Sequence, residues 1–308
     1  MSILTKEYFH DEAAAFAKLE SIVWPEGPTC PHCGACDRIG EIKGKTARMG
    51  LKKCGHCRKQ FTVKVGTVFE SSHVPLHKWF QAVYLVVSSK KGFSAHQLHR
   101  TLEVTYKTAW FMHHRIREAL RSGDLAPFGQ DGGIVEVDET FIGNDKTVKP
   151  KGQKKGRGAH HKFKVLSLVE RSTGRARSIV VDDLKAATLA PIVRENLAKE
   201  AQLMTDEASQ YTKLGREFAS HGVVRHQQGE YGRGEIHTNT IEGFFSIFKR
   251  GMKGVYQHCG QQHLHRYLAE FDFRYSERER SDIDRAQTAL RGIIGRRLTY
   301  RDSQEART

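Results

Sequence analysis

The spacing of apolar residues changes near residue 130, where a helical pattern gives way to a pattern of strands. Before this point, apolar residues recur every three or four positions, which is typical of helices that bury one face. After it, short apolar runs alternate with polar positions and end at turn residues, as strands do. The first part predicts helices at residues 3–20, 76–88, 94–102 and 105–121. The second part predicts strands at residues 134–142, 161–170, 175–181, 203–205 and 222–226, and helices at residues 186–199, 211–218, 240–253 and 257–276.

The order of these elements predicts the fold of the second part. Three consecutive strands are followed by helix, strand, helix, strand and helix, which is the order of an RNase H-like domain. We therefore expect a multidomain protein of the α+β or α/β class. Its expected parts are an N-terminal helix (1–24), a cysteine-rich segment (25–70), a helical segment (71–124), an RNase H-like domain with C-terminal helices (130–280) and a C-terminal tail (281–308).

Two Cys-x-x-Cys pairs predict a metal site in the cysteine-rich segment. Cys30 and Cys33 form the first pair, Cys54 and Cys57 form the second, and twenty residues separate the pairs. This spacing is typical of a four-cysteine zinc ribbon, in which two tight turns offer four thiolates to a structural Zn²⁺. Cys36 lies close enough in the sequence to replace Cys33 as a ligand. The alternative is a set of core cysteines without a metal.

The charge balance narrows the range of partners. Lys and Arg total 50, Asp and Glu total 35, and the net charge of +15 favours a polyanionic partner. Composition alone leaves nucleic acid, the ribosome and an acidic membrane surface open. No apolar run approaches the roughly 20 residues of a membrane-spanning helix, and the first residues lack a secretory pattern. We therefore expect a cytoplasmic protein that does not cross a membrane.

Residues 94–121 resemble a helix-turn-helix DNA reader. Ser94 is a suitable N-cap for the first helix. The second helix begins with Tyr106 and Lys107, at the end where a recognition helix meets base edges. This pattern predicts a DNA contact by Lys107, and the alternative is a three-helix packing domain without a DNA-binding role.

A basic insertion separates the first two predicted strands of the RNase H-like domain. Residues 146–164 contain eight Lys or Arg residues and no acid. A segment of this composition beside an active site would contact the DNA backbone. A solvated loop is the alternative, and the two are compatible if the loop becomes ordered on DNA. The expected DNA contacts in this insertion are Lys151, Lys154, Lys155 and Arg157.

Three acids in the second part have the positions that a catalytic metal site needs. Asp138 lies near the end of the first strand, Asp206 ends the fourth, and Glu242 lies early in a helix. Strand alternation turns Glu139 away from Asp138, so only one of the two is expected to be the main ligand. Acids on two strand ends and one helix can converge to hold two divalent ions for phosphodiester chemistry. Each acid alone is more simply a capping or salt-bridging carboxylate.

The helix that carries Glu242 has a polar and an apolar stripe. Helical spacing puts Asn239, Glu242, Ser246 and Lys249 on one stripe. The neighbouring apolar stripe would bury the helix and hold Glu242 rigidly at the edge of the core. Lys249 and the adjacent Arg250 are expected to contact DNA phosphates. The members of the apolar stripe are Ile241, Phe245, Phe248 and Met252.

Together, these motifs resemble those of bacterial insertion-sequence transposases that have a zinc ribbon ahead of a DDE-type (ISXO-like) catalytic domain. The resemblance is carried by the cysteine pairs and by residues 135–143 (VEVDETFIG), 205–207 (TDE) and 237–250 (HTNTIEGFFSIFKR). It implies cleavage at transposon ends and strand transfer into target DNA, with Mg²⁺ or Mn²⁺ as the catalytic ion. It also implies double-stranded DNA as the partner, a homo-oligomer on that DNA and a nucleoid-associated protein.

The resemblance leaves the third catalytic residue open, because members of this group can have Asn at that position, followed by Lys. Both Asn239 and Glu242 fit the polar stripe. Glu242 is preferred, since a carboxylate binds a hard cation better than an amide does.

Two other functions remain as alternatives at this stage. A zinc-ribbon regulator would bind DNA without cutting it, and a structure-selective nuclease would cut DNA without joining it. Converging carboxylates favour an enzyme over the regulator.

Overall fold

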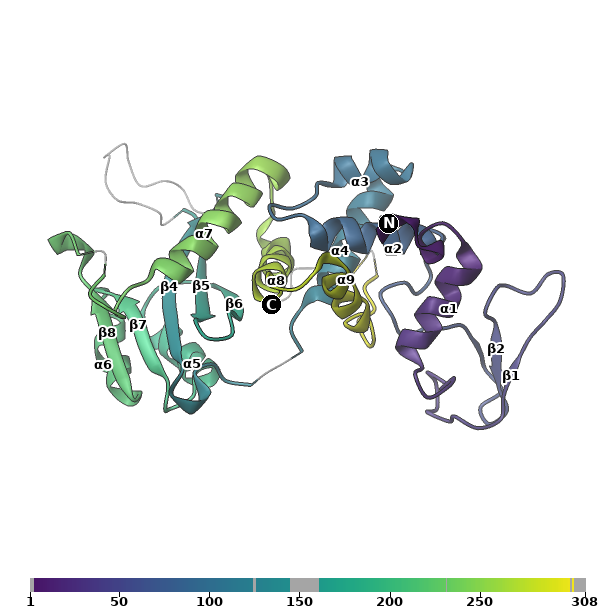
Figure 1. The fold of residues 1–308 in the computed structure, drawn as a ribbon, viewed down its shortest axis with the longest axis horizontal. Coiled ribbons are helices and arrows are strands. Elements are labelled where there is room, and N and C mark those ends of the chain that lie inside the picture. Colours follow the sequence, from purple (N-terminus) through teal and green to yellow (C-terminus); the bar gives the residue numbers. More distant parts are fainter. Residues whose placement is uncertain (1–2, 124–125, 145–160, 231, 300, 302–308) are drawn as a thin grey trace. The chain divides into compact units, whose positions relative to one another are not determined.

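The computed structural model describes residues 3–123, 126–144, 161–230, 232–299 and 301. The described chain forms two compact units, drawn in Figure 1. The first unit comprises Met1–Arg121 and Arg280–Glu305, and the second comprises Ser122–Glu279. None of the helices in the described ranges has the length and apolar character needed to cross a membrane.

The N-terminal helix begins later than the sequence pattern predicts. Two 3-10 turns, Ile3–Thr5 and Glu7–Phe9, precede α1 (Glu12–Val23). Asp11 starts α1, because its side chain accepts a hydrogen bond of 2.7 Å from the backbone N–H of Ala14. The predicted start at residue 3 was therefore wrong, because the helix begins after its N-cap Asp11.

The cysteine-rich segment forms a small antiparallel sheet. Its strands are β1 (Ile39–Glu41), β2 (Lys52–Cys54) and β3 (Gln60–Phe61), in that order across the sheet. Cys54 pairs with Ile39 at the end of β2, so the second cysteine pair starts where this strand stops. The apolar core of this segment is small, with Cys30, Cys54 and Phe61 as the buried members, and a metal site is the usual means of stabilising such a segment.

Three predicted helices of the first unit are confirmed: α2 (Leu76–Ser88), α3 (Ala95–Leu102) and α4 (Tyr106–Leu120). Ser94 and Gln97 form a capping box at the start of α3. Glu103 ends α3 in the left-handed conformation, with φ of 53°, and Thr105 caps α4. This sharp turn between two capped helices is the helix-turn-helix connection that the sequence predicts.

The segment expected to be a C-terminal tail contains a further helix, α9 (Asp282–Arg291). It packs against α2 and α4 of the first unit. Ala286, Ala289 and Leu290 are its buried residues. The tail prediction was wrong for this part, because two of the three buried side chains are alanines, which give a weak apolar pattern in the sequence.

The second unit contains a five-stranded mixed sheet, confirming the predicted RNase H-like architecture. The sheet order is β6-β5-β4-β7-β8. β4 pairs with β5 and β5 with β6 in antiparallel fashion, whereas β4, β7 and β8 are parallel. The strands are β4 (Ile134–Ile142), β5 (Phe163–Glu170), β6 (Ala176–Val181), β7 (Gln202–Asp206) and β8 (Ser220–Val224).

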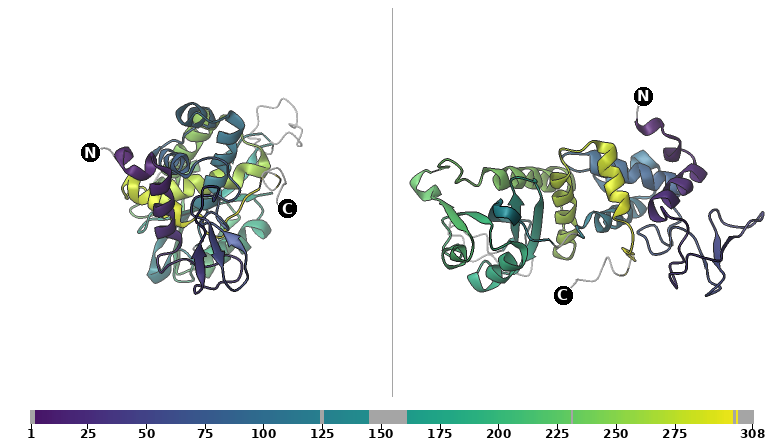
Figure 2. Two further views of the ribbon diagram at one scale, coloured as in Figure 1. Left: turned by 90° about the vertical axis from the view of Figure 1, so that its right-hand side faces the viewer. Right: turned by 60° about the horizontal axis from the view of Figure 1, so that its bottom comes forward.

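Helices cover both faces of this sheet, as two further views show (Figure 2). On one face, Val135 and Val137 of β4 pack in a core with α5 and α6. On the other face, a second core joins the sheet to α7 and α8. The helices are α5 (Ala186–Asn196), α6 (Tyr211–Leu214), α7 (Asn239–Gly251) and α8 (Gln261–Ser276). A π-helical turn, Met252–Tyr256, continues α7.

Candidate metal centres and active site

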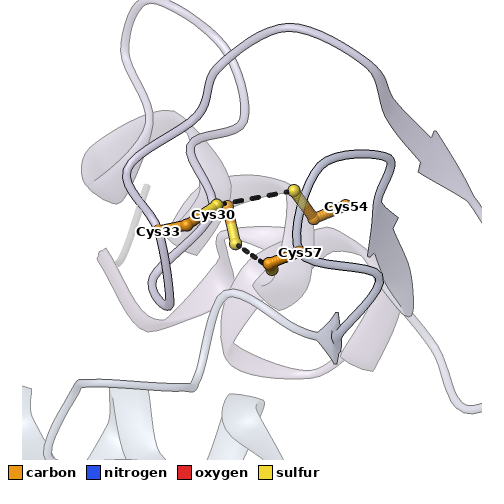
Figure 3. A group of neighbouring side chains, drawn as sticks. All are labelled: Cys30, Cys33, Cys54 and Cys57. Atoms are coloured by element: carbon orange, nitrogen blue, oxygen red, sulfur yellow. Dashed lines mark hydrogen bonds between the residues drawn. The ribbon is translucent and has the colours of Figure 1, made fainter.

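The four paired cysteines form a site that fits a zinc ion (Figure 3). Their Sγ atoms all lie within 4.8 Å of one another. The Sγ atoms of Cys30 and Cys57 are 3.6 Å apart, and those of Cys33 and Cys54 are 3.7 Å apart. A tetrahedral zinc with Zn–S bonds of about 2.3 Å requires sulfur–sulfur distances of about 3.8 Å. The site therefore has the size of a closed, structural zinc centre, and Cys36, which is exposed, lies outside it.

The backbone favours the thiolate form at the second cysteine pair. Hydrogen bonds from the backbone N–H groups of Cys57 and His56 lower the pKa of the Cys54 thiol to about 6. A thiolate is the form that binds zinc, and tight turns that offer N–H groups to sulfur stabilise it. His56 itself contacts Asp37 at 2.9 Å, outside the sulfur cluster.

Asp138 and Asp206 lie at matching positions of two neighbouring strands of the five-stranded sheet. β4 and β7 are parallel neighbours, and Glu136 pairs with Met204 in their ladder. Each aspartate follows its paired residue by two positions, and side chains two positions apart in a strand point to the same face. Because neighbouring strands lie about 4.8 Å apart, the two carboxylates are brought together where β7 ends, beside the middle of β4.

Negative charge is concentrated around Asp138. Burial raises the pKa of this carboxyl to about 8, and the charges of Glu139, Asp206 and Glu242 add to the effect. Glu139 points to the opposite face, where it accepts hydrogen bonds from the Tyr211 hydroxyl and the Gln210 amide. The predicted strand alternation is therefore correct, and Asp138 is the one that faces the helix with Glu242.

The three predicted catalytic acids are close but do not form a closed ligand set. Within the ranges that the structure describes, the four cysteines are the one group of three or more metal-binding side chains whose ligand atoms lie within 4.8 Å. Glu242 is about half exposed, with 49% of its side chain accessible. Its Oε1 accepts a hydrogen bond of 2.9 Å from the Thr238 hydroxyl and lies 3.7 Å from Nε2 of His226. A side-chain rotation would release Glu242 from Thr238.

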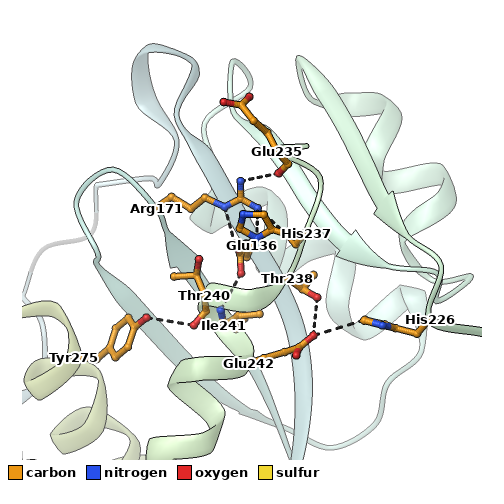
Figure 4. Close-up of polar contacts among 10 residues, drawn as sticks. All are labelled: Glu136, Arg171, His226, Glu235, His237, Thr238, Thr240, Ile241, Glu242 and Tyr275. Atoms are coloured by element: carbon orange, nitrogen blue, oxygen red, sulfur yellow. Dashed lines mark hydrogen bonds and ion pairs between the residues drawn. The ribbon is translucent and has the colours of Figure 1, made fainter. Parts of the chain in front are cut away.

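A buried carboxylate connects α7 to the central strand (Figure 4). Glu136 is fully buried, and its Oε2 accepts a hydrogen bond of 2.8 Å from the backbone N–H of Ile241, in the first turn of α7. Its Oε1 accepts a hydrogen bond of 2.6 Å from Nε of Arg171 and lies 3.3 Å from Nδ1 of His237. Ile241 precedes Glu242, and Glu136 lies two residues before Asp138. This contact therefore fixes the helix that carries one acid against the strand that carries another.

Arg171 and Tyr275 extend this connection, which we call the Glu136 anchor. Arg171 also donates to the backbone carbonyls of Glu235 and His237, both at 2.7 Å. The Tyr275 hydroxyl donates to the carbonyl of Thr240 at 3.2 Å. The sequence analysis missed the Glu136 anchor. The available signal was a carboxylate between the apolar residues Val135 and Val137, since a buried acid needs a partner.

The polar stripe of α7 is confirmed, with exposed Asn239, Glu242 and Ser246 above a buried apolar stripe. Lys249 is half-buried, burial lowers the pKa of its ammonium group, and the charge of Asp138 acts on it. Arg250 is exposed, and its Nε donates to the carbonyl of Ser246 at 3.1 Å. The geometry thus brings Lys249 and Glu242 into electrostatic reach of Asp138.

The structure describes one of the five remaining predicted DNA contacts. Lys107 is exposed in the first turn of α4, in the first unit. The other four basic residues lie outside the described residues: Lys151, Lys154, Lys155 and Arg157.

Comparison with known proteins identifies both parts of this arrangement. Residues 131–276 match the ISXO2-like transposase domain, and residues 10–60 match the transposase zinc-ribbon domain. A protein of the transposable element ISH50 from Halobacterium salinarum is 30% identical over 277 residues, which cover 86% of this chain and 91% of the relative. A transposase-like protein from Haemophilus influenzae is 26% identical over 118 residues, covering 38% of this chain and 94% of the relative. The chain therefore belongs to the insertion-sequence transposases that combine a transposase zinc-ribbon domain with an ISXO2-like transposase domain.

Proposed function

We propose that this transposase binds double-stranded DNA at the ends of its insertion sequence, cuts a phosphodiester bond there and joins the end to target DNA. The proposal is supported mainly by the matching positions of Asp138 and Asp206 on the parallel neighbours β4 and β7, where the charge of Asp206 acts on Asp138. Glu242 and Lys249 lie within electrostatic reach of Asp138. This is the arrangement of acids and a cation that phosphoryl transfer requires.

The donor set fits a hard divalent cation, because it consists of carboxylates in a region of concentrated negative charge. Mg²⁺ or Mn²⁺ bound there supplies Lewis-acid stabilisation of the attacking and leaving oxygens. Asp138 and Asp206 hold the ligand oxygens on neighbouring strands. Glu242 would complete the set by a side-chain rotation away from Thr238, and the Glu136 anchor holds its helix against β4.

Hydrolysis frees a 3′-hydroxyl at the transposon end, and this hydroxyl then attacks a target phosphodiester in line. Neither step needs a covalent protein–DNA bond, so no Ser or Tyr nucleophile is assigned. Lys249 neutralises charge on the reacting phosphate, with Arg250 beside it on α7. His237 contacts Glu136 and Arg171, and we assign it to the Glu136 anchor.

Glu242 is the proposed third catalytic residue. Its charge acts on Asp138, and its carboxylate is a better ligand for a hard cation than the amide of Asn239. Glu242→Gln is therefore expected to abolish cleavage, whereas Asn239→Ala retains it. Loss of cleavage in Asn239→Ala with full activity in Glu242→Gln would reverse the assignment.

DNA binding is proposed to use both units. Lys107 on α4, the basic insertion around Lys151–Arg157 and the end of α7 are the proposed phosphate contacts. Cutting two ends and joining them to one target requires more than one active site, so we propose a homo-oligomer on DNA.

The test uses the purified, zinc-loaded protein with plasmid DNA that carries the ends of its element, with and without Mg²⁺. Asp138→Asn and Asp206→Asn are expected to bind DNA as the wild type does and to lose cleavage. Asp182→Asn, an exposed aspartate after β6, is the matched control and should cleave normally. Cleavage by either active-site variant in Mg²⁺ contradicts the proposal.

The same assay separates the two alternatives. With precleaved ends and a target plasmid, a transposase yields joined products, and a structure-selective nuclease yields none. A regulator would bind the ends and cut nothing under any metal condition.

A further inference from the structure

A pocket lies beside the proposed catalytic acids, within the second unit. Its volume is about 490 Å³, and it opens between the end of β4 and the π-helical turn that follows α7. Lys249 lines this pocket and also interacts with Asp138. The side chain of Lys249 therefore connects the pocket wall with the surroundings of Asp138.

The inner wall of the pocket is apolar. Ile142, Phe163, Met252 and Leu264 line it, and each is at most 8% exposed. Phe141 adds a second, half-buried aromatic side chain. A wall of this kind fits a flat, weakly polar group, because base-sized rings stack on aromatic and apolar side chains.

Three ammonium groups gather at the same pocket. Lys162, Lys249 and Lys253 all line it, and the charges of Lys162 and Lys253 both act on Lys249. The charge of Asp138 offsets part of this repulsion at Lys249, and a bound phosphate would offset the repulsion among all three lysines. The lining therefore combines a site for a phosphate with a site for a flat apolar ring.

The backbone around the opening is strained in the way that binding sites often are. Gln257, a lining residue, has φ of 59° and ψ of −49°. The N–H of His258 donates to the carbonyl of Tyr256 at 2.6 Å, which makes Gln257 the centre of a classic γ-turn. Strained turns persist only where the surrounding structure holds them in place, and both strained turns and π-helical turns are frequent at functional sites.

We propose that this pocket captures one unpaired nucleotide of a DNA strand, with its phosphate on the lysines and its base on the apolar wall. The proposal rests on DNA being the substrate of this transposase. A stacked base pair does not fit a pocket of this size, so the nucleotide must leave the helix, as in enzymes that flip a base. Capture beside Asp138 would hold the neighbouring phosphodiester at the acids.

Cys259 provides a probe of the pocket in the native chain. Its thiol lines the pocket and is half-buried. The experiment measures the alkylation rate of Cys259 by peptide mass spectrometry, in zinc-loaded protein without added Mg²⁺. Four DNA conditions are compared: no DNA, a blunt duplex, and the same duplex with unpaired nucleotides at its 3′ or at its 5′ ends. Inorganic phosphate is tested separately, and the exposed Cys36 normalises reagent reactivity.

A duplex with unpaired ends is expected to slow alkylation of Cys259 about fivefold or more relative to the blunt duplex, in a saturable manner. Lys253→Met should remove most of this protection, because it deletes one exposed phosphate contact. Lys213→Met, an exposed lysine on α6, should leave it unchanged. Equal protection by blunt and unpaired ends contradicts the proposal, as does full protection by phosphate alone.

The readout does not depend on cleavage, so the two proposals fail separately. If DNA protects Cys259 but the protein does not cut DNA in the cleavage assay, the proposed enzymatic function is contradicted and nucleotide capture is not. Cleavage of DNA without any protection of Cys259 would contradict nucleotide capture and leave the proposed enzymatic function intact.

Discussion

At the scale of single residues, the buried carboxylate of Glu136 holds α7 against β4 in the proposed active site. Glu136 is fully buried and has partners on two other segments of the chain, Arg171 and the first turn of α7. Removing one partner of a buried carboxylate strongly destabilises the folded protein. The folded state therefore favours the arrangement in which Arg171 and the first turn of α7 both contact Glu136. Asp138 lies two positions later on the same strand, so the contacts of Glu136 also fix the distance between Asp138 and α7.

Removing the charge of Glu136 should therefore reduce cleavage as well as stability. Glu136→Gln keeps the side-chain shape but weakens the bond to Arg171, and we expect a loss of about 2–4 kcal/mol in the free energy of unfolding. A small shift of α7 should lower the cleavage rate about 10- to 100-fold. It should also raise the Mg²⁺ concentration needed for half-maximal cleavage while DNA affinity stays constant.

Glu217→Gln is the matched control, because it removes the same charge from an ion pair with Arg194 at the surface of the same unit. Its thermal midpoint and its Mg²⁺ dependence should stay near those of the wild type. If Glu136→Gln unfolds more easily but keeps the wild-type Mg²⁺ dependence, Glu136 has a structural role only.

The sequence could identify candidates for the acids but not their surroundings. Asp138 and Asp206 end apolar runs, which places each of them on a predicted strand, and period-two alternation turns Glu139 away from Asp138. Glu136 has the same spacing pattern, and only its partners Arg171 and Ile241, far along the chain, mark it as an anchor. The helical pattern also cannot decide whether Asn239 or Glu242 is the third ligand, because both residues lie on one stripe of the helix.

At the scale of elements, the zinc ribbon is expected to depend on its metal. Cys54→Ser removes a ligand whose thiolate the backbone stabilises, so the purified protein should lose about one equivalent of zinc. The ribbon should then become sensitive to proteolysis, because its three short strands have little core of their own. Elemental analysis and limited proteolysis provide the measurements.

Cys36→Ser is the control for this change, because Cys36 is exposed and outside the sulfur cluster. It should retain zinc and resist proteolysis as the wild type does. Loss of zinc in Cys36→Ser, with retention in Cys54→Ser, would overturn the ligand assignment.

Helix α9 is expected to stabilise the first unit. Ala289 is 1% exposed where α9 packs against α2 and α4, so Ala289→Asp should cost about 3 kcal/mol or more through burial of an unpaired charge. Denaturant unfolding measures the loss, and Arg291→Gln, at an exposed position of the same helix, should change it little. An unchanged midpoint in Ala289→Asp would mean that α9 does not pack as described.

Elements with large apolar residues could be predicted from the sequence, and those without them could not. α2 and β4 have the predicted bounds, since each buries several large side chains. α9 was missed because alanines give a weak pattern. The start of α1 was wrong because capping by Asp11, rather than apolar spacing, decides it.

At the scale of the whole molecule, the net charge of +15 should make DNA binding strongly dependent on salt. Each phosphate contact adds about 0.9 to the slope of log affinity against log salt concentration. Neutralising the basic insertion should therefore reduce this slope by about 2–4 and weaken binding alike on all sequences. The substitutions to Gln are Lys151, Lys154, Lys155 and Arg157.

A second variant with the same net charge tests whether the salt dependence comes from the basic insertion or from the net charge alone. It carries Gln at four basic residues on or next to α5 and α6: Lys185, Lys199, Lys213 and Arg216. Its slope should stay close to that of the wild type. Equal slopes for both variants would show that the insertion makes no special contact with DNA.

The most direct measurement of the central claim is anomalous diffraction from Mn²⁺ in crystals of this transposase bound to DNA. We expect one ion within about 2.1 Å of carboxylate oxygens from both Asp138 and Asp206, and a second about 4 Å away with Glu242 turned toward the pair. Manganese bound elsewhere, or these aspartates facing away from each other, would contradict the account.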